Sequence, residues 1–507
     1  MLNTQNSSIM ATIIVYLAFM VAIGIIFSKR NRTSDDFSLG GRKLGPLVTA
    51  MSAEASDMSS YLLMGLPGLA YLSGLADVTW TAIGLAVGTY LNWLFVSKRL
   101  RRYSAKIGSI TIPDFFTKRF HDGSHALETI AAAVIIIFFV PYVGSGFAAC
   151  GKLFNSLFGV DYVKAMIICG IIIAVYTMLG GFMAASFTDL IQSIIMTIAI
   201  IVVLVFGIVS AGGVGAVVQN AQSMPGFLSM SQTYLADSGT AAAYGPITVL
   251  STVAWGLGYF GMPHILLCFM AIRDEKELKL SRRIASIWVV IAMGIAIMIG
   301  IIGKTMSDFG IIDSLSGSAT ENVIVRIAHL ISTHGVLAAI VAGLILAGIL
   351  AATMSTADSQ LLAASSSVTQ NIIGGLFGKK LEQKQNLIIA RLTVVIIAVI
   401  GMVIARDPNS SVFGIGSFAW AGFGAAVGPL MLLSLFWKRT TRAGALAGMI
   451  GGGAMIFIWK FGVRPLGGAL NIYELLPAFL VSIVLIVVVS LATKAPAKEI
   501  VEEFESV

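Results

Sequence analysis

Charged residues are scarce in this chain of 507 residues. Asp, Glu, Lys and Arg together make up 11% of it, whereas a water-soluble chain would carry about 25%. Hydrophobic residues make up 57%, and the mean hydropathy is +0.91. So few polar side chains cannot cover a surface that faces water on all sides. The composition therefore excludes a soluble globular protein and predicts a chain that lies mostly within a membrane.

Cysteine is also rare. The three cysteines, Cys150, Cys169 and Cys268, lie in or beside apolar segments and lack the spacing of a metal site, so we interpret them as small buried residues. No cleavable signal peptide is evident. The first apolar run, residues 9–27, is long enough to span a bilayer and is followed by basic residues, which is typical of a retained first helix.

Long apolar runs recur along the whole chain. A helix needs about 20 residues to cross a hydrocarbon core of about 30 Å, and thirteen segments meet that length. We therefore predict an all-α polytopic membrane protein that forms a single domain, residues 1–507, with about 13 transmembrane helices. The predicted spans are 9–27, 44–69, 74–96, 126–149, 163–183, 189–213, 246–271, 284–306, 336–364, 387–405, 411–437, 443–462 and 474–493.

The basic residues predict the orientation. Thirteen spans place the two termini on opposite sides of the membrane. With the amino terminus outside, 26 of the 33 Lys and Arg fall in cytoplasmic loops or in the short tail 494–507, as positive-inside bias requires. We expect a multi-pass protein of a cell membrane with a cytoplasmic carboxyl terminus. The net charge of +8 then reflects topology, and no nucleic-acid partner is expected.

The second predicted span carries polar residues at membrane depth, where they are costly. Glu54 and Asp57 lie among serines and alanines, and a Gly-Leu-Pro-Gly sequence follows at 65–68. This pattern favours a broken helix, which is tolerated where it lines a cavity or is buried in protein. The alternative is an unbroken helix whose serines hydrogen-bond to neighbouring helices.

The seventh predicted span is interrupted as well. Three glycines and Pro263 fall within the eight residues that follow Trp255. Trp255 and Tyr259 would be neighbours if that stretch stays helical. The alternative is a kinked packing helix with a buried aromatic pair. His264 is more often a buried, hydrogen-bonded histidine than a ligand.

The ninth predicted span has a face of small residues that ends in two hydroxyls, Ser355 and Thr356. Hydroxyl and carbonyl oxygens suit a hard monovalent cation, and the thiolate and imidazole groups of a transition-metal site are missing. Two Gly/Pro-interrupted spans, five spans apart, indicate a secondary transporter built from inverted repeats. We expect core repeats at about 44–213 and 246–437, with peripheral helices at 9–27, 443–462 and 474–493.

At these residues the chain resembles the sodium/solute symporter family and, within it, the bacterial branch that carries proline. The likeness covers nearly the whole chain. It is carried by residues 52–59, 63–68, 255–263 and 351–356, and also by Asp35-Asp36-Phe37, residues 40–46, Thr188, Asp189, Gln192 and residues 419–426.

The resemblance implies a LeuT-type core of two inverted five-helix repeats, with a sodium site between the second and ninth spans. The sodium ligands would be the backbone carbonyls of Ala55, Met58 and Ala352 and the hydroxyls of Ser355 and Thr356.

Further positions follow from the same resemblance. Asp57 matches a carboxylate that is needed for sodium coupling. The positions that match substrate binding are Ser59, Tyr142, Trp255, Tyr259 and Pro263. Glu54 departs from the family pattern, because some members have a small residue there, and the sequence assigns it no role.

The function that this resemblance implies is sodium-coupled import of L-proline by alternating access, with no organic cofactor and no obligate protein partner. The same fold could carry another small solute, or protons through Asp57. A membrane enzyme is disfavoured, because no nucleophile with its base and no metal cluster stands out in the sequence. A sensor is disfavoured by the short tail, and a channel by the asymmetric placing of the polar residues.

Overall fold

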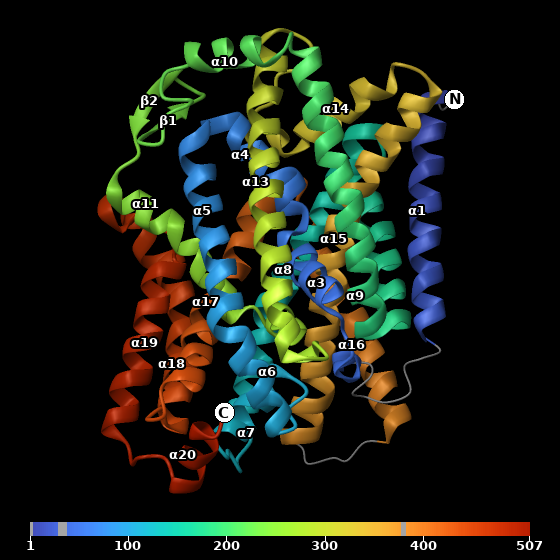
Figure 1. Ribbon diagram of the computed structural model, residues 1–507. Coiled ribbons are helices and arrows are strands. Elements are labelled where there is room, and N and C mark those ends of the chain that lie inside the picture. The colour runs from blue at the N-terminus through green and yellow to red at the C-terminus, as the bar shows by residue number, and fades with distance from the viewer. Residues whose placement is uncertain (1–3, 29–37, 377–381) are drawn as a thin grey trace.

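The computed structural model describes residues 4–28, 38–376 and 382–507. Helices that run roughly along one axis form almost all of this part of the chain (Figure 1). The exception is a small antiparallel hairpin of β1 (Gln232–Leu235) and β2 (Thr240–Ala243). The all-α fold is therefore confirmed. The string Asp35-Asp36-Phe37, the basic residues at 29–32 and the lysines at 379 and 380 lie outside the described residues.

The helices occupy the following residues, where η marks a 3-10 or π helix. The first half of the chain contains α1 (Thr4–Ser28), η1 (Gly40–Arg42), α3 (Pro46–Ser60), η2 (Tyr61–Gly65), α4 (Leu66–Ser73), α5 (Leu75–Leu91), η3 (Asn92–Val96), α6 (Ser97–Lys106), α7 (Ile112–Arg119), α8 (Ala126–Phe158), α9 (Tyr162–Ser210) and α10 (Val214–Ser223). The second half contains α11 (Pro246–Val253), η4 (Ala254–Gly261), α12 (Pro263–Ala271), η5 (Glu275–Glu277), α13 (Leu278–Asp308), η6 (Gly317–Asn322), α14 (Val323–Ser332), α15 (Val336–Ser366), η7 (Ser367–Leu376), α16 (Gln383–Ile404), α17 (Val412–Phe436), α18 (Arg442–Phe457), η8 (Ile458–Val463), η9 (Arg464–Leu466), η10 (Gly468–Leu470), α19 (Leu475–Ala492) and α20 (Lys498–Glu505).

Nine helices in the described part of the chain are long and apolar enough to cross a membrane, and a bent pair, Pro246–Gly261 with Pro263–Ala271, brings the number to ten. The other predicted spans fall on interrupted segments. The second covers α3, η2 and α4, the third covers α5 and η3, and the fifth and sixth share α9, which turns at Gly181 (φ 65°). The multi-pass character is thus plain, while the number thirteen stays a prediction.

Both predicted helix breaks are present. In α3 the break is at Ser59, whose φ of 49° and ψ of −168° are rare for a residue with a side chain. A π-helical turn, η2, follows before α4 resumes with Pro67 in its first turn. In the seventh span the tight η4 ends at Gly261, the next residue, Met262, is extended, and Pro263 begins α12. Proline suits that first helical position because its missing N–H would have no partner there.

Close backbone contact explains two glycines of α5. A Cβ at Gly84 or Gly88 would lie 2.3 Å from the carbonyl oxygen of Val253 or Gly256. No side chain fits at that distance, so α5 and the backbone from Val253 to Gly256 pack directly on each other. This contact holds the interrupted seventh span in the interior of the bundle.

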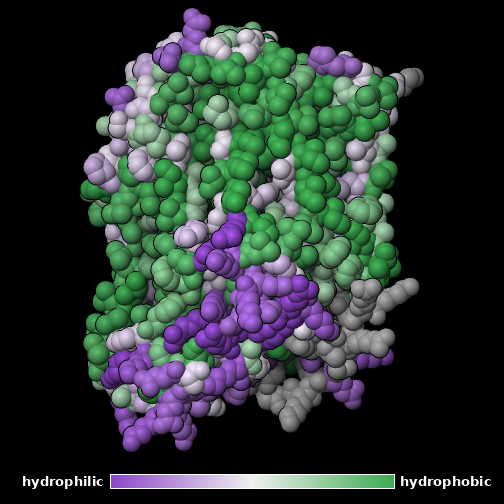
Figure 2. Space-filling model, viewed as in Figure 1, coloured by the Kyte–Doolittle hydropathy of each residue, from purple (hydrophilic) through white to green (hydrophobic). Residues whose placement is uncertain are grey.

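One end of the molecule, the end that carries α6, α7 and α20, is rich in hydrophilic side chains and is called the basic end below. Figure 2 shows hydrophilic residues at this end and apolar ones over most of the rest of that face. The chain closes this end between α3 and α12, because the Leu44 N–H donates to Ala271 O (3.2 Å) and the Arg273 N–H to Leu44 O (3.0 Å). The guanidinium of Arg42 donates to Met270 O (2.7 Å) and to Ser109 O (2.6 Å).

Candidate functional site

The break in α3 faces the hydroxyl pair of α15. Ser355 Oγ donates to Ala55 O at 2.9 Å and lies 3.2 Å from Ala352 O. Thr356 Oγ1 donates to Ala352 O at 3.1 Å. Four of the five predicted sodium ligands therefore meet at one contact between two helices. Met58, the fifth, is buried just before the break at Ser59.

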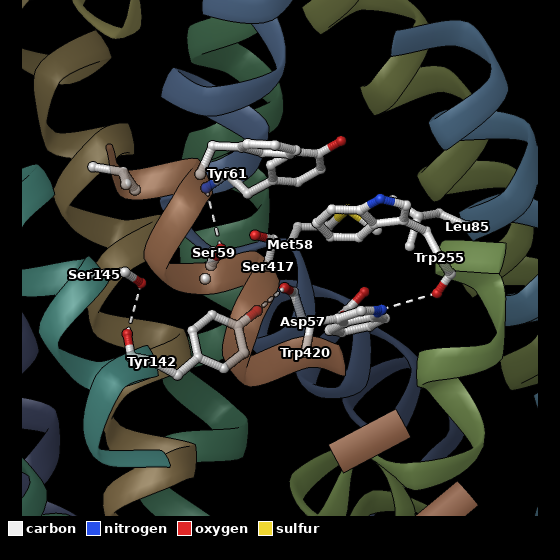
Figure 3. A pocket seen from close by; sticks show the side chains of 13 residues that line it. Asp57, Met58, Ser59, Tyr61, Leu85, Tyr142, Ser145, Trp255, Ser417 and Trp420 are labelled. Atoms are coloured by element: carbon white, nitrogen blue, oxygen red, sulfur yellow. Dashed lines mark hydrogen bonds between the residues drawn. The ribbon is translucent and has the colours of Figure 1, made fainter. Parts of the chain in front are cut away.

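A narrow cavity lies at the break in α3, with about 30 Å³ open to the centre of a water molecule. Its walls come from α3, η2, α5, α8, η4 and α17, and Figure 3 shows their side chains. It is lined by Asp57, Met58, Ser59, Tyr61, Leu85, Tyr142, Ser145, Trp255, Val412, Phe413, Gly416, Ser417 and Trp420. A smaller cavity shares Ser59 and Tyr142 with it and is also lined by Thr356. Ser59 and Tyr142 therefore lie between the main cavity and Thr356 of the hydroxyl pair.

Stacked aromatic rings form one wall of the cavity. The Trp255 ring lies 4.7 Å from Tyr473, 5.3 Å from Phe413 and 6.0 Å from Tyr61, measured between ring centroids, and it is stacked on all three. Three of these rings come from three different elements: η2, η4 and α17. Tyr61, Trp255 and Phe413 of this stack line the cavity, and Tyr473 does not. The wall therefore exists only in the folded bundle, and it presents apolar ring atoms to a small ligand.

The acidic group at the cavity is the carboxyl of Asp57. Its Oδ2 accepts a hydrogen bond from the Tyr259 hydroxyl, and its backbone carbonyl accepts one from the Tyr142 hydroxyl at 3.3 Å. Its Oδ1 is buried and has no partner among the described residues. A buried carboxylate with an unpaired oxygen is costly, and a cation beside it would reduce that cost.

The structure does not bring all predicted substrate positions to the cavity wall. Ser59, Tyr142 and Trp255 line it. Tyr259 does not, although it contacts the cavity indirectly through its hydrogen bond to Asp57. Pro263 is buried at the start of α12 and is not part of the lining.

Sequence reasoning missed Trp420 as a lining residue. Its indole N–H donates to Trp255 O at 2.9 Å, and its ring meets the Tyr259 ring edge-on at 5.1 Å. Because its one polar atom is satisfied, Trp420 presents an apolar face to the cavity. The resemblance included residues 419–426 but gave Trp420 no role. Nothing in the sequence around Tyr61, Phe413 and Ser417 predicted that they would line a cavity.

Glu54, which had no role at the level of sequence, is buried beside the break. Its Oε1 accepts a hydrogen bond from Trp93 Nε1 at 2.9 Å. Its Oε2 has no partner among the described residues. The indole thus provides a polar contact for a carboxyl that the sequence suggested would need water or a partner.

Two more carboxyls, Asp189 of α9 and Asp358 of α15, are buried. Asp189 Oδ2 accepts from Ser52 Oγ at 2.6 Å. Asp358 follows the hydroxyl pair by two residues. Polar side chains therefore continue from the break in α3 towards α9.

Comparisons with known proteins agree with this geometry. The family model described as "Sodium:solute symporter family" matches residues 37–452. The osmoregulated proline transporter OpuE of Bacillus subtilis is 40% identical over 486 residues, which cover 96% of this chain and 94% of that protein. The sodium/proline symporter of Escherichia coli is 38% identical over 503 residues, covering 98% and 96%.

A solved structure supports the fold. A Na⁺-coupled sialic acid symporter, in a substrate-bound outward-open state, superposes with a TM-score of 0.79. The alignment covers 97% of this chain and 99% of the symporter, at 18% sequence identity. At that identity the likeness concerns the fold alone.

Proposed function

The chain belongs to the sodium:solute symporter family, and on that premise we propose that it imports L-proline into the cell together with sodium, by alternating access. The observation that carries the proposal is the position of the cavity. It is lined by residues of two broken helices, and α3, one of the two, contacts Ser355 through Ala55. Relatives that match almost the whole chain are named as proline transporters, which supports the choice of solute.

Sodium would bind where α3 meets α15. Its ligands would be the carbonyl oxygens of Ala55, Met58 and Ala352 and the hydroxyl oxygens of Ser355 and Thr356. The two hydroxyls donate hydrogen bonds to carbonyl oxygens of this group. A bound sodium ion would replace the hydroxyl hydrogens as the partner of those carbonyl oxygens. Asp57, with its unpaired oxygen, would supply a nearby negative charge.

Proline is a zwitterion with an apolar ring, and the cavity offers surfaces for both parts. The ring would pack against Trp255 and Trp420. The ammonium would face aromatic rings, which attract cations. The carboxylate would face the N–H groups and positive dipole at a helix break, near the Ser59 hydroxyl. The substrate would thereby contact the same broken helix that holds sodium.

Coupling follows from that shared helix. Sodium would tie α3 to α15 and favour the conformation that binds proline, and proline would strengthen sodium binding by the same free energy. One sodium ion moving through 100 mV releases about 2.3 kcal/mol. A tenfold sodium gradient adds about 1.4 kcal/mol. Together these terms could support a proline gradient of several hundredfold.

Two further features belong to the proposal. The basic end would face the cytoplasm and the amino terminus the outside, because of the bias in Lys and Arg. The core would consist of two inverted repeats, at about 44–213 and 246–437, in which the broken α3 corresponds to the broken η4–α12 segment.

The test is uptake of radiolabelled L-proline into proteoliposomes under three conditions: an inward sodium gradient at fixed pH, an inward proton gradient without sodium, and neither gradient. We expect accumulation that requires the sodium gradient. Uptake that follows a proton gradient alone would assign protons as the coupling ion. If folded protein moves no proline under either gradient, the assignment of proline as the substrate is wrong, and the alternative is another small solute.

A further inference from the structure

The helix α20 (Lys498–Glu505) lies on the basic end, next to α6 and α7 (Figure 1). An irregular segment, residues 493–497, connects it to α19. A helix of eight residues is not stable by itself in water. The structure of α20 therefore depends on its contacts with the rest of the protein.

The main contact is a phenylalanine ring between two arginines. Phe504 is the one buried residue of α20. Its ring centroid lies 4.6 Å from the guanidinium carbon of Arg99 and 4.9 Å from that of Arg119. The Arg99 Nη2 also donates to Phe504 O at 3.3 Å. We call this arrangement the arginine clasp: Arg99, Arg119 and Phe504.

Arg119 gives the clasp its energetic importance. Its side chain is fully buried, and its Nε donates to Ser434 O at 3.0 Å. Neither terminal nitrogen has a hydrogen-bond partner among the described residues. Burial lowers the pKa of this guanidinium. Aromatic faces, that of Phe504 among them, and the nearby charge of Glu503 therefore compensate the buried positive charge of Arg119.

The remaining contacts of α20 are polar and mostly exposed. Lys438 Nζ lies 2.7 Å from Glu505 Oε1, with both side chains more than half exposed. The Tyr103 hydroxyl donates to Glu503 Oε1 at 3.1 Å, and Arg102 Nη1 donates to Val507 O at 3.0 Å. Exposed ion pairs contribute little and weaken in salt. The clasp is therefore what chiefly keeps α20 docked.

The helix α6, which α20 contacts through Arg99, also makes hydrogen bonds that close the basic end. Arg99 belongs to α6, and from the same helix Arg101 Nε donates to Ile272 O at 2.7 Å. Ser104, near the end of α6, accepts hydrogen bonds from Arg42. Arg119 lies on α7, and Lys438 follows α17, so α20 bridges α6 to two other elements.

We propose that α20 is a strap that holds the basic end closed, and that release of Phe504 from the arginine clasp frees α6 and lets this end open. The strap acts on the balance between closed and open conformations. It would act in the same way whichever solute the cavity binds.

Hydrogen–deuterium exchange of the purified full-length protein tests this directly. The amides of Leu44 and Arg273 donate across the closed end, so their exchange reports opening. In Phe504→Ala we expect α20 to exchange freely. We expect peptides that contain Leu44 or Arg273 to exchange roughly 2-fold to 30-fold faster, the range that loss of one cation–π contact produces.

Three companion variants make the result specific. Glu502→Ala changes an exposed residue of the same helix and should exchange like the wild type. Glu503→Lys removes the acceptor of the Tyr103 hydroxyl and puts a positive charge beside His121, so it should weaken the docking of α20 while leaving the Phe504 ring in place. Phe504→Leu keeps an apolar cover without the ring and should have an intermediate effect.

The outcomes are decisive without any transport assay. If α20 becomes free in Phe504→Ala or Glu503→Lys while Leu44 and Arg273 exchange at the wild-type rate, the strap does not hold the end closed. If α20 stays protected in both variants, the clasp does not hold α20. Either result overturns the proposal, and neither bears on proline or sodium.

Discussion

Asp57 has a buried carboxyl and lies two residues before the break of a membrane helix. Its carboxylate accepts from Tyr259 and keeps one oxygen unpaired. Asp57→Ala should abolish sodium-dependent proline uptake, because the cation site loses its nearby negative charge. The measurement is initial uptake rate against sodium concentration in proteoliposomes.

Tyr259→Phe is the matched control for Asp57. It removes the hydroxyl that donates to the carboxylate but leaves the charge, so sodium should still activate uptake. Sodium activation that persists unchanged in Asp57→Ala would contradict the assigned role of Asp57.

Ser355 and Thr356 provide a second prediction at this scale. Removing either hydroxyl by substitution with Ala should raise the sodium concentration for half-maximal uptake by roughly 5-fold or more, as expected for loss of one polar contact. The proline concentration for half-maximal uptake, measured at saturating sodium, should change much less. Ser365→Ala removes a buried hydroxyl farther along α15 and should leave both constants near wild type. A change in the half-maximal proline concentration alone would show that the sodium site lies elsewhere.

Between elements, a buried ion pair joins three parts of the bundle. Lys152 Nζ of α8 lies 2.6 Å from Glu321 Oε2 of η6, and both side chains are 6% exposed. Glu321 also accepts from Ser411 Oγ (2.9 Å) and from the Phe413 N–H (3.2 Å), at the start of α17. This carboxylate satisfies N–H groups that the first turn of a helix leaves free and fixes the start of α17 next to the aromatic wall.

Lys152→Met should therefore destabilise the protein by about 3–5 kcal/mol, because it leaves the Glu321 carboxylate buried and uncompensated. Thermal unfolding in detergent measures the loss. The double variant Lys152→Met with Glu321→Gln should recover part of it, since the buried charge is then gone. A single variant as stable as the wild type would mean that water already compensates Glu321.

For the molecule as a whole, the sequence predicted those features that depend on local chemistry. The fold class followed from the length of the apolar runs. The two helix breaks followed from glycine, proline and serine near Ser59 and Pro263, since each alters the backbone at its own position. The contact of Ser355 with Ala55 agrees with the resemblance to the family, which had placed both at one site.

Features that depend on long-range packing could not be predicted. Trp420 lines the cavity because its indole reaches Trp255, 165 positions away along the chain. The partner of Glu54 is Trp93, on another helix. The docking of Phe504 needs two arginines some 400 residues earlier. Apolar runs give no sign of such pairings, because partners that lie far apart along the chain are brought together only by the packing of the folded bundle.

The orientation of the whole molecule provides the last prediction. The three native cysteines are buried, so a cysteine placed on the surface can be labelled selectively. Asp237, in the hairpin of β1 and β2, is exposed at the end of the molecule opposite α20, and Glu499 is exposed on α20 (Figure 1).

If most Lys and Arg face the cytoplasm, Asp237→Cys should react with a membrane-impermeant maleimide in intact cells. Glu499→Cys should react only after the cells are permeabilised. The reverse pattern would invert the orientation and make uptake through the proposed pathway run from the basic end. The predicted chain crosses the membrane an odd number of times between Asp237 and Glu499, so the two residues should lie on opposite sides. Reaction of both cysteines in intact cells would contradict that topology.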